Sequence, residues 1–539
     1  MPQHLGSSMN VNADPAAPGL DARSPEPPPS RRSWAWAFAV FVVGALLVGL
    51  VLRFLTVSDL WLDEALTVNV ARLPLGELQE ALKRDGAPPL YYLLLHGWML
   101  VFGTGDVAVR ALSGVLGVAM LPLAYLAGLR LGGDDPDRRR WVAWSAVLVV
   151  VSSPYAIRYS TEARMYMVAM VLVLIGYLAL ANALERPRLG WLALIAVVTA
   201  ALLYTQYWAF FLVGVLGAIQ LWRAVRGPAA ERATAWRIVA AIAVGGLAFV
   251  PWLPTFAYQM QHTGTPWDTP ASPPTNAALG VLDFAGGRVL EGWTLVLPLV
   301  VLALLALFGR AADRVHVSLD LRTVPGVRWE WFVGAATLIA GLTLSLAIGT
   351  GFQSRYAAVM FPLFALAVAF GVTAFADRRI RAAVLALVVL MGFVGGARNV
   401  VTNRTQASQV VDAITADARP GDVVGFCPDQ LGPDVARLVP DGADLGLMAW
   451  PDGRAPTFVD WVDYADRNAA TSPETYAGEL LDEADGNTVW LVWSSGYRTL
   501  DGKCEAVIDA LGHARPAWAE LVVPDQEIYE FMGLRRFDP

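Results

Sequence analysis

The chain has 539 residues, of which 56% are hydrophobic and only 16% are charged. Soluble proteins carry roughly 25% charged residues, so this composition excludes an ordinary soluble domain. The apolar residues fall in blocks of about twenty, which is long enough for a helix to cross a bilayer. The formal net charge of -7 decides little, because topology depends on where the basic residues lie. The sequence therefore predicts a polytopic α-helical membrane protein, with no nucleic-acid partner.

The first 33 residues are rich in Pro, Ala and Ser and cannot build a core. This composition predicts that residues 1–33 form a disordered cytoplasmic tail. The apolar run that follows is too long for the hydrophobic region of a signal peptide, so we expect a retained first span. About eleven spans are expected, at 34–55, 107–130, 141–154, 163–184, 190–204, 207–224, 237–258, 290–309, 331–349, 357–376 and 382–398.

The loops between these spans alternate between two kinds. One kind is basic, as in "DDPDRRR" at 134–140 and "DRRIR" at 377–381, and the positive-inside rule places such loops in the cytoplasm. The apolar segment 88–103 is short for a crossing, and it would force the 134–140 loop outside if it crossed. We therefore expect this segment at the outer face, within a first outer loop at 56–106. A membrane domain is expected over 34–400 in the plasma membrane, with a cytoplasmic N terminus.

After residue 400 the charge rises and the apolar runs shorten to strand length. We expect strands at 422–427, 445–450, 488–496, 519–523 and 528–537, and helices near 405–418, 474–485 and 502–512. This alternation is typical of a small α/β domain, which we expect over 401–539 outside the cytoplasm. Cys427 and Cys504 both fall in this domain. They are either two separate buried thiols or a disulfide, which an oxidising compartment would allow.

Charged and aromatic residues collect at the outer ends of the expected spans. The stretch "DLWLDEALT" (59–67) sets Asp63 beside Glu64, although acidic residues next to hydrocarbon are costly and need a reason. Arginines and tyrosines at span ends are each compatible with simple anchoring at the interface. As a set, arginines and tyrosine hydroxyls suit a phosphate at headgroup depth. A carboxylate opposite them suits a general base that deprotonates a hydroxyl.

Several of these segments also resemble a known family. They are "WLDEALT", "PPLYYLLLHGWMLVFG" followed by "VRALSG", "RYSTEARMYM", "YTQYW" and "SRYAAVMFP", in that order. With them, residues 34–400 resemble the GT-C glycosyltransferases of the family 39 type. That family includes protein O-mannosyltransferases, lipid A aminoarabinose transferases and the RgtA/B/C/D-like group. The resemblance implies a sugar donor linked to polyprenyl phosphate, an acceptor reached from the outer face, and inversion at the anomeric carbon.

The resemblance also implies roles for individual residues. Asp63 matches the catalytic acidic position, with Glu64 as its supporting neighbour. The implied contacts to the donor phosphate and sugar are Arg110, Arg158, Arg164, Arg355 and Tyr356. Contacts to the acceptor or its loops are expected from Glu162, Tyr204, Gln206, Gln259 and Trp267. The compositional bias toward Ala, Arg, Val and Gly is typical of a high-GC bacterium, where mannose or arabinose is the expected sugar. The acceptor is a glycolipid, a polysaccharide or a protein.

Two positions depart from the family pattern. Ala87 and Gln206 stand where many relatives have His, which removes a proton carrier or a metal ligand. No cofactor is implied with certainty, and a divalent metal has no support in the sequence. A transporter or flippase of lipid-linked sugars is the main alternative, but it predicts repeats and polar residues near mid-bilayer. The second alternative is a non-catalytic protein of envelope assembly. That function leaves the carboxylate pair and the arginines unexplained.

Overall fold

The computed structural model describes residues 31–264, 272–349, 351–440, 442–495 and 500–539. The chain divides into two compact units, Met1–Val43 and Gly44–Pro539. Helix α1 (Arg31–Leu52) begins in the first unit and ends in the second. The second unit holds all the other helices and strands within the described ranges.

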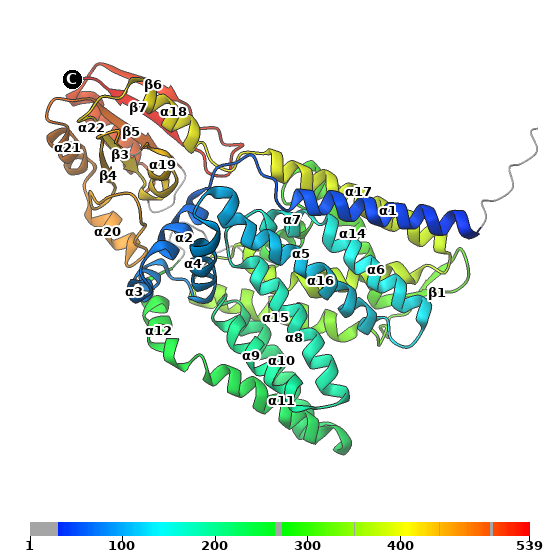
Figure 1. Cartoon of the computed structure of the whole chain (residues 1–539). Coiled ribbons are helices and arrows are strands. Elements are labelled where there is room, and N and C mark those ends of the chain that lie inside the picture. The colour runs from blue at the N-terminus through cyan, green and yellow to red at the C-terminus, as the bar shows by residue number, and fades with distance from the viewer. Residues whose placement is uncertain (1–30, 265–271, 350, 441, 496–499) are drawn as a thin grey trace, which may run out of the picture. The chain divides into compact units, whose positions relative to one another are not determined.

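The first part of the second unit is helical, from α2 to α17 (Figure 1). Its α-helices are α2 (Leu62–Arg72), α3 (Leu75–Asp85), α4 (Leu90–Phe102), α5 (Asp106–Leu131), α6 (Pro136–Ser152), α7 (Pro154–Ser160), α8 (Tyr166–Glu185), α9 (Leu189–Leu203), α10 (Ala209–Arg226), α11 (Ala229–Leu247), α12 (Leu253–His262), α13 (Pro273–Phe284), α14 (Leu290–Phe308), α15 (Arg328–Ile348), α16 (Phe361–Gly371) and α17 (Arg378–Val401). Short 3-10 helices are η1 (Val250–Trp252), η2 (Ser354–Val359) and η3 (Val372–Ala374), and a two-stranded antiparallel hairpin joins β1 (Gly309–Ala311) to β2 (Val317–Leu319).

Among the described residues, seven helices are long and apolar enough to cross a membrane. They are Asp106–Leu131, Tyr166–Glu185, Ala209–Arg226, Ala229–His262, Leu290–Phe308, Arg328–Ile348 and Arg378–Val401. Helices α6 and α7, bent by 58° at a short break, make an eighth if they form one broken span. The other three expected spans correspond to the shorter apolar helices Trp36–Leu52, Leu189–Leu203 and Phe361–Ala374. The protein is thus a multi-pass helical membrane protein, with seven to eight spans by length where the sequence predicted about eleven.

The difference in count comes from helix length. A helix rises 1.5 Å per residue, so the 15-residue α9 is only about 22 Å long, against a hydrocarbon core of about 30 Å. Hydropathy alone marked it as a span, because it is apolar on every side. The 13-residue α4 covers most of the segment 88–103, which was expected not to cross.

Close approaches between helices rely on small residues. A Cβ added at Gly128 in α5 would lie 2.6 Å from the Ala143 Cα of α6, and one added at Gly371 would lie 1.9 Å from the Leu302 carbonyl oxygen of α14. Small residues allow such backbone contact in membrane helices. These glycines therefore allow α5 to approach α6, and α16 to approach α14, more closely than a larger residue would.

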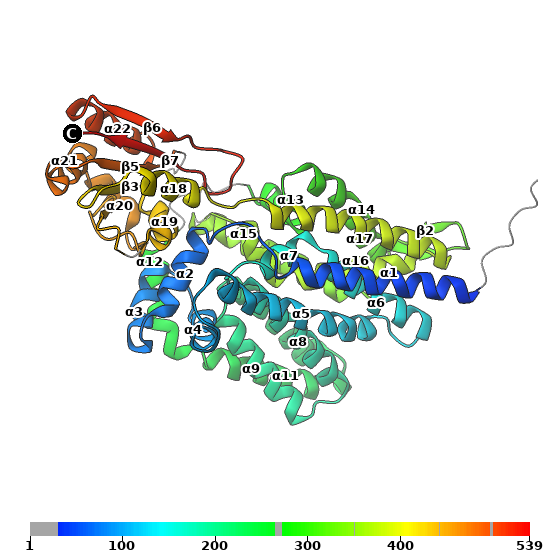
Figure 2. The ribbon, with the colours of Figure 1, turned by 45° about the horizontal axis from the view of Figure 1, so that its top comes forward.

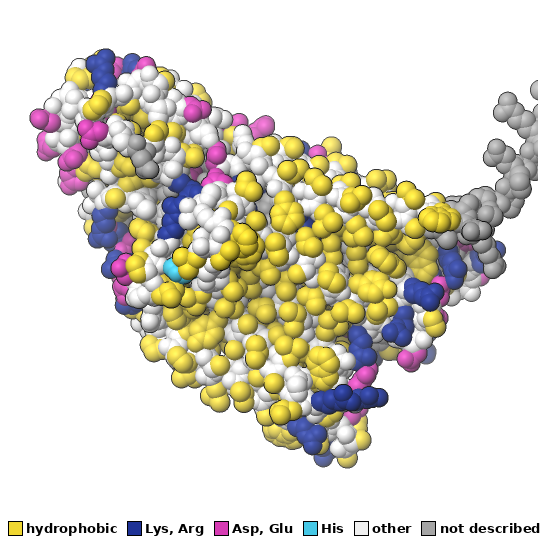
Figure 3. All heavy atoms as spheres, in the orientation of Figure 1, with side chains coloured by type: hydrophobic (Ala, Val, Ile, Leu, Met, Phe, Trp, Pro, Cys, Tyr) yellow, Lys and Arg dark blue, Asp and Glu magenta, His cyan; other side chains and the backbone are white. Residues whose placement is uncertain are grey.

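The surface of the helical part is predominantly apolar on the face shown in Figure 3. Lys and Arg side chains on this face gather near the ends of the helices opposite the C-terminal domain. Arg138, Arg139 and Arg140 at the start of α6, and Arg186 and Arg188 before α9, are exposed. The basic loops therefore lie at the other end of the helical part from the C-terminal domain.

The C-terminal domain is a mixed α/β sheet domain, as the sequence predicted. Its elements are α18 (Ala407–Asp417), β3 (Val423–Cys427), η4 (Asp429–Leu431), α19 (Gly432–Leu438), β4 (Gly446–Ala449), α20 (Tyr464–Ala470), α21 (Pro473–Ala484), β5 (Val489–Trp493), α22 (Lys503–Ala514), β6 (Trp518–Val522) and β7 (Gly533–Phe537). The strand order is β4-β3-β5-β7-β6. Strands β4, β3 and β5 are parallel, and β7 is antiparallel to both β5 and β6.

Alternating residues of β3 face two separate cores. Val423 and Cys427 belong to the core that α21 and α22 cover, whereas Val424 and Phe426 belong to the core beneath α18 and α19. This two-residue alternation is the period of a strand that is covered on both faces. Cys427 and Cys504, at the start of α22, form a disulfide with an S–S distance of 2.06 Å.

The C-terminal domain packs against the segment 56–106 through polar contacts. Helix α19 packs on α2, and Figures 1 and 2 both show the domain beside α2 and α3. Arg437 Nη2 lies 3.0 Å from Asp106 Oδ1 at the start of α5. The Trp461 N–H donates to the Arg84 carbonyl oxygen at 3.2 Å. These contacts bring the domain to the end of the membrane helices where Asp63 lies.

Candidate functional site

Asp63 lies in the first turn of α2, and its side chain is 15% exposed. Two guanidinium groups face its Oδ2 atom. Arg355 Nη1, from η2, lies 3.5 Å away, and Arg164 Nη2, from the turn between α7 and α8, lies 3.6 Å away. Arg164 also donates to the Thr67 hydroxyl, one turn along α2, at 2.8 Å. Three segments that are distant in the sequence therefore place two cations against one carboxylate oxygen.

The neighbouring Glu64 is buried instead. It accepts from Arg110 Nε at 2.8 Å and Nη2 at 2.5 Å, and from the Ala163 N–H at 2.8 Å. Arg110, on α5, also donates to the carbonyl oxygens of Ser58 at 2.6 Å and Asp59 at 2.8 Å. Burial alone would raise the pKa of Glu64, but Arg110 outweighs it and holds that pKa below its usual range. Glu64 and Arg110 thus tie α2, α5 and the 161–163 turn together behind Asp63.

Glu162 supplies another buried carboxylate in this region. Its Oε2 lies 3.4 Å from Arg158 Nε, and only 1% of the residue is exposed. Burial raises the pKa of Glu162, against the opposing effect of Arg158. Arg404, just after α17, donates to the Thr161 carbonyl oxygen at 2.9 Å and to its hydroxyl at 2.7 Å. The 161–163 turn is therefore fixed from both sides.

The N terminus of α2 is held by the C-terminal domain. The Leu62 N–H, one residue before Asp63, donates to both carboxyl oxygens of Glu530, at 3.1 and 3.2 Å. The N-cap residue Trp61 offers no side-chain cap, so Glu530 satisfies a helix donor that would otherwise be unpaired. Burial raises the pKa of Glu530 well above its usual range, and the nearby Asp434 raises it further. The orientation of Asp63 therefore depends on a residue near the other end of the chain.

Tyr529, beside Glu530, reaches the arginines. Its hydroxyl accepts from Arg355 Nη1 at 3.2 Å, and the Arg158 guanidinium lies 5.5 Å from its ring centre. The ring packs edge-on against Trp61 with centroids 5.0 Å apart. Trp61 also lies 5.8 Å from the Arg355 guanidinium. An aromatic wall from two domains thus lines the cations around Asp63.

Several polar atoms around Asp63 are buried and make no hydrogen bond to any described residue. They include Asp63 Oδ2, Arg164 Nε, Arg355 Nε, the Tyr166 hydroxyl and Gln206 Oε1. Buried polar groups in native proteins almost always have partners, so each exception needs an explanation. A ligand that carries an anionic group and hydroxyls would supply partners to the donors and acceptors among these atoms.

The remaining predicted residues fall in different places. Gln206 donates to the Tyr356 carbonyl oxygen at 3.3 Å, which puts it beside the cluster, and Tyr356 stacks on Trp208. The Tyr204 hydroxyl donates to the Ala248 carbonyl oxygen at 3.0 Å, so it joins α9 to the end of α11. Gln259 donates to the carbonyl oxygens of Leu82 and Ala87 and so holds the end of α3. Trp267 lies outside the described residues.

Sequence reasoning missed three groups that contact the cluster: Arg404, Tyr529 and Glu530. None lies in the segments that resemble the family. It also left Asp85 unassigned. The Tyr92 hydroxyl donates to Asp85 Oδ2 at 2.6 Å. Burial raises the pKa of Asp85, while Arg164 lowers it and Asp63 raises it. The only signal for Asp85 was its place in the outer loop, which other charged residues share.

Over the described ranges, no group of three or more His, Cys, Asp or Glu side chains is arranged to hold a metal ion.

Comparisons with known proteins bear on the fold. No protein-family model and no curated protein matched the chain. Among solved structures, ArnT from Cupriavidus metallidurans bound to undecaprenyl phosphate matches with a TM-score of 0.52 and 12% identity, over 94% of this chain and 98% of that chain. The chain therefore shares the overall fold of ArnT. ArnT in the apo state gives a TM-score of 0.52 at 13% identity, with the same coverage.

An oligosaccharyltransferase from Archaeoglobus fulgidus, tethered with an acceptor peptide, matches with a TM-score of 0.48 and 12% identity, over 85% of this chain and 69% of that chain. The ArnT likeness confirms the fold expected from the sequence motifs. The assignment to the family 39 type remains a prediction.

Proposed function

We propose that the protein is a membrane glycosyltransferase that moves a sugar from a polyprenyl-phosphate donor to an acceptor on the outer face. The observation that carries this proposal is the pair of guanidinium groups at 3.5 and 3.6 Å from one oxygen of Asp63. Two cations and a carboxylate that lie side by side can serve both groups that react in a glycosyl transfer. The departing phosphate needs positive charge, and the acceptor hydroxyl needs a base.

In the proposed reaction, an acceptor hydroxyl oxygen attacks the anomeric carbon while Asp63 takes its proton. The bond between that carbon and the phosphate oxygen breaks, and polyprenyl phosphate leaves with the bonding electrons. Arg164 and Arg355 stabilise the negative charge on the leaving phosphate. Attack from the face opposite the leaving group inverts the anomeric centre. Because Asp63 and the arginines already lie together, arrival of the donor phosphate would draw the cations from the carboxylate.

Other residues of the cluster are assigned to positioning. Glu64 and Arg110 are consumed by their own ion pair and by backbone contacts, so we assign them to holding α2. The Arg158 side chain is 28% exposed, so a ligand can reach it. We assign Arg158 and Tyr356 to contacts with the donor. The match to ArnT bound to undecaprenyl phosphate supports a polyprenyl-phosphate lipid as the donor class. Mannose and arabinose remain the sugars to test first.

We further propose that the protein lies in the plasma membrane. Its C-terminal domain would then lie outside the cytoplasm and its N terminus inside. The exposed arginines at the opposite ends of the helices support this orientation through the positive-inside rule. The disulfide between Cys427 and Cys504 also suits an oxidising compartment. Protease added to intact spheroplasts should therefore cut the C-terminal domain. Protection of that domain until the membrane is opened would reverse the orientation.

The donor class is tested with purified protein in liposomes. The donors offered are polyprenyl-phosphate mannose, polyprenyl-phosphate arabinose and the matching nucleotide sugars, with envelope extract as the acceptor source. We expect transfer from a lipid-linked donor only, and a product anomer opposite to the donor anomer by NMR. Transfer from a nucleotide sugar would contradict the proposal. Accelerated flipping of the lipid-linked sugar without any transfer would identify a transporter instead.

A further inference from the structure

The C-terminal sheet has a crevice at the ends of β3 and β4. These strands are parallel neighbours, but the chain leaves them toward opposite faces of the sheet. After β3 the chain enters α19, whose Val435 packs in the core on one face of the sheet. After β4 it continues through α20 to α21, whose Tyr476 packs in the core on the other face. In open α/β sheets, ligands bind outside the carboxyl ends of the strands at such a switch point.

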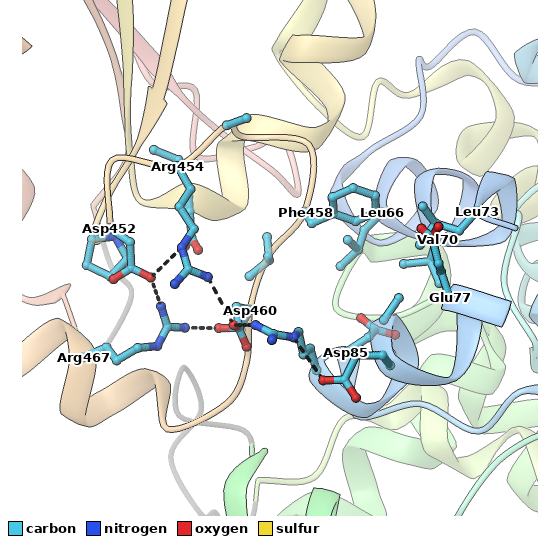
Figure 4. Close-up of a pocket in the computed structure, with 18 of the residues that line it drawn as sticks. Leu66, Val70, Leu73, Glu77, Asp85, Asp452, Arg454, Phe458, Asp460 and Arg467 are labelled. Atoms are coloured by element: carbon cyan, nitrogen blue, oxygen red, sulfur yellow. Dashed lines mark hydrogen bonds and ion pairs between the residues drawn. The ribbon is translucent and has the colours of Figure 1, made fainter. Parts of the chain in front are cut away.

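A cavity of about 630 Å³ occupies this position. Ligand pockets usually enclose about 300–1,000 Å³, so its size is sufficient for a small molecule or a headgroup. Asp429 follows β3, and Trp450 and Asp452 follow β4, and all three line the cavity. In Figure 4, Leu66, Val70, Leu73 and Phe458 lie on one side of the cavity, and the charged cluster of Asp452, Arg454 and Arg467 lies on the other.

The cavity also borders the helix that carries Asp63. Leu66 and Val70 line it, and they follow Asp63 on α2 at helical spacing, which puts all three on one face of the helix. Asp85 lines the cavity too, and it interacts electrostatically with both Arg164 and Asp63. The cavity therefore lies along the same face of α2 as the carboxylate.

The arginines of the cavity are already paired. Arg467 Nη1 lies 2.5 Å from Asp452 Oδ2, and Arg84 Nη1 lies 2.8 Å from Asp460 Oδ2. Arg454 lies 3.6 Å from each of these two carboxylates. A phosphate or sulfate group would need free cations, whereas carboxyl oxygens accept hydrogen bonds from hydroxyls. Phe458 is 42% exposed and adds an aromatic surface. The lining therefore suits a neutral, hydroxyl-rich ligand.

We propose that this cavity binds the carbohydrate headgroup of the acceptor and directs one of its hydroxyls toward Asp63. This inference rests on the proposed glycosyltransferase function and narrows the acceptor to a glycan-bearing molecule. Sugar hydroxyls bond to the carboxyl groups of Asp429 and Asp85, and a sugar C–H face packs on Phe458. The C-terminal domain then supplies half of the acceptor site, which explains its close contact with α2 and α3.

Two variants test the cavity directly. Phe458→Ala removes the aromatic surface. Gly76→Trp fills the cavity from α3, where an added Cβ meets nothing within 4 Å. The matched controls lie in the C-terminal domain, outside the cavity. Trp518→Ala removes an exposed aromatic of β6, and Gly478→Trp adds a side chain on α21 in similarly open space. Thermal melting of all four proteins checks that they fold.

The measurement is binding of a panel of labelled mono- and oligosaccharides of mannose, arabinose, galactose, glucose and rhamnose to the purified full chain. We expect at least one to bind. Phe458→Ala should weaken that binding about 3- to 10-fold, Gly76→Trp should abolish it, and the controls should not change it. In transfer assays the acceptor KM should rise in the two cavity variants while the donor KM stays unchanged.

The outcomes separate the two proposals. If no sugar of the panel binds, or if the cavity variants bind as tightly as wild type, the cavity is not the acceptor site. Transfer by wild type in either case would leave the glycosyltransferase function standing. If sugars bind through the cavity but no lipid-linked donor supports transfer, the proposed function fails, and the acceptor role of the cavity fails with it.

Discussion

The Tyr529 hydroxyl of the C-terminal domain accepts a hydrogen bond from Arg355 of the membrane domain at 3.2 Å. The same Arg355 nitrogen lies 3.5 Å from Asp63 Oδ2. The C-terminal domain is therefore part of the candidate site as well as a neighbour of it. Its contribution comes from the loop before β7, which also supplies Glu530 to the N terminus of α2.

This contact predicts that Tyr529→Phe lowers transfer. The variant loses the hydrogen bond to Arg355 but keeps the ring beside Trp61. A hydrogen bond of this kind contributes about 1 kcal/mol, so kcat/KM for the donor should fall about fivefold. Tyr529→Ala should cost more, because it also removes the ring contact. Unchanged kinetics in Tyr529→Phe, with Trp518→Ala as the control, would remove Tyr529 from the site.

The arginine pair predicts a loss of donor affinity on conservative substitution. Arg355→Lys and Arg164→Lys keep the charge but lose the planar fork that binds a phosphate through two bonds. We expect each to lower kcat/KM for the lipid-linked donor roughly tenfold. Arg130→Lys is the matched control, since Arg130 pairs with Glu185 at 2.9 Å near the basic loops. Equal effects in all three variants would point to general destabilisation.

The Glu64–Arg110 pair predicts an effect on stability. Breaking a buried ion pair from one side costs about 3–5 kcal/mol, so Glu64→Gln and Arg110→Met should each lower the melting temperature substantially. The double variant should lose less than the sum of the two, because neither Glu64 nor Arg110 then remains buried without the other. The Arg223–Glu231 pair, at 2.7 Å but partly exposed, provides the control. Its removal should cost less than about 1 kcal/mol, and additive losses at Glu64 and Arg110 would refute the coupling.

The sequence predicted the convergence of Asp63, Arg164 and Arg355 at one end of the helices. This could be predicted because the basic loops mark the cytoplasmic side of the membrane. The loops that carry the polar residues could then be assigned to the outer side. The small sheet was accessible too, since β3 and β5 are continuous apolar runs and several expected strands matched. The last expected strand, 528–537, began too early. Residues 528–532 form the loop that carries Tyr529 and Glu530 to α2.

Side-chain pairing was beyond the sequence. Asp63 and Glu64 are adjacent, and their spacing alone could not tell which of them faces the site. On a helix they point about 100° apart, so one meets the arginines of the site and the other meets Arg110. The resemblance implied that Arg110 contacts the donor. Nothing in "VRALSG" shows that its guanidinium also reaches the Ser58 and Asp59 carbonyl oxygens. The packing of α2 against α5 and the turn before α8, within the membrane domain, decides these contacts.

Asp429 predicts a pH dependence of stability. Burial raises the pKa of Asp429 from 3.8 to about 7. Between pH 4 and 7 the folded state therefore holds a proton that the unfolded chain releases, so its stability falls as pH rises through this window. The loss amounts to about 4 kcal/mol in full. Asp429→Asn still accepts a bond from the Tyr464 hydroxyl, which donates to Asp429 Oδ1 at 2.6 Å.

We therefore expect Asp429→Asn to melt at a higher temperature than wild type at pH 8, with a smaller difference at pH 5. The exposed Asp466→Asn, on α20, should show no such difference. A melting temperature for Asp429→Asn that tracks wild type at both pH values would contradict the assignment of a buried, neutral carboxyl group.

The most direct measurement is sugar transfer from a polyprenyl-phosphate donor by wild type and Asp63→Asn, purified at equal amounts and checked for equal melting temperatures. Asparagine keeps the size of the side chain and cannot take a proton. We predict that Asp63→Asn binds the donor but transfers sugar roughly 10²- to 10⁴-fold more slowly, the usual contribution of a general base. Transfer by Asp63→Asn at the wild-type rate would contradict the central claim that Asp63 is the base.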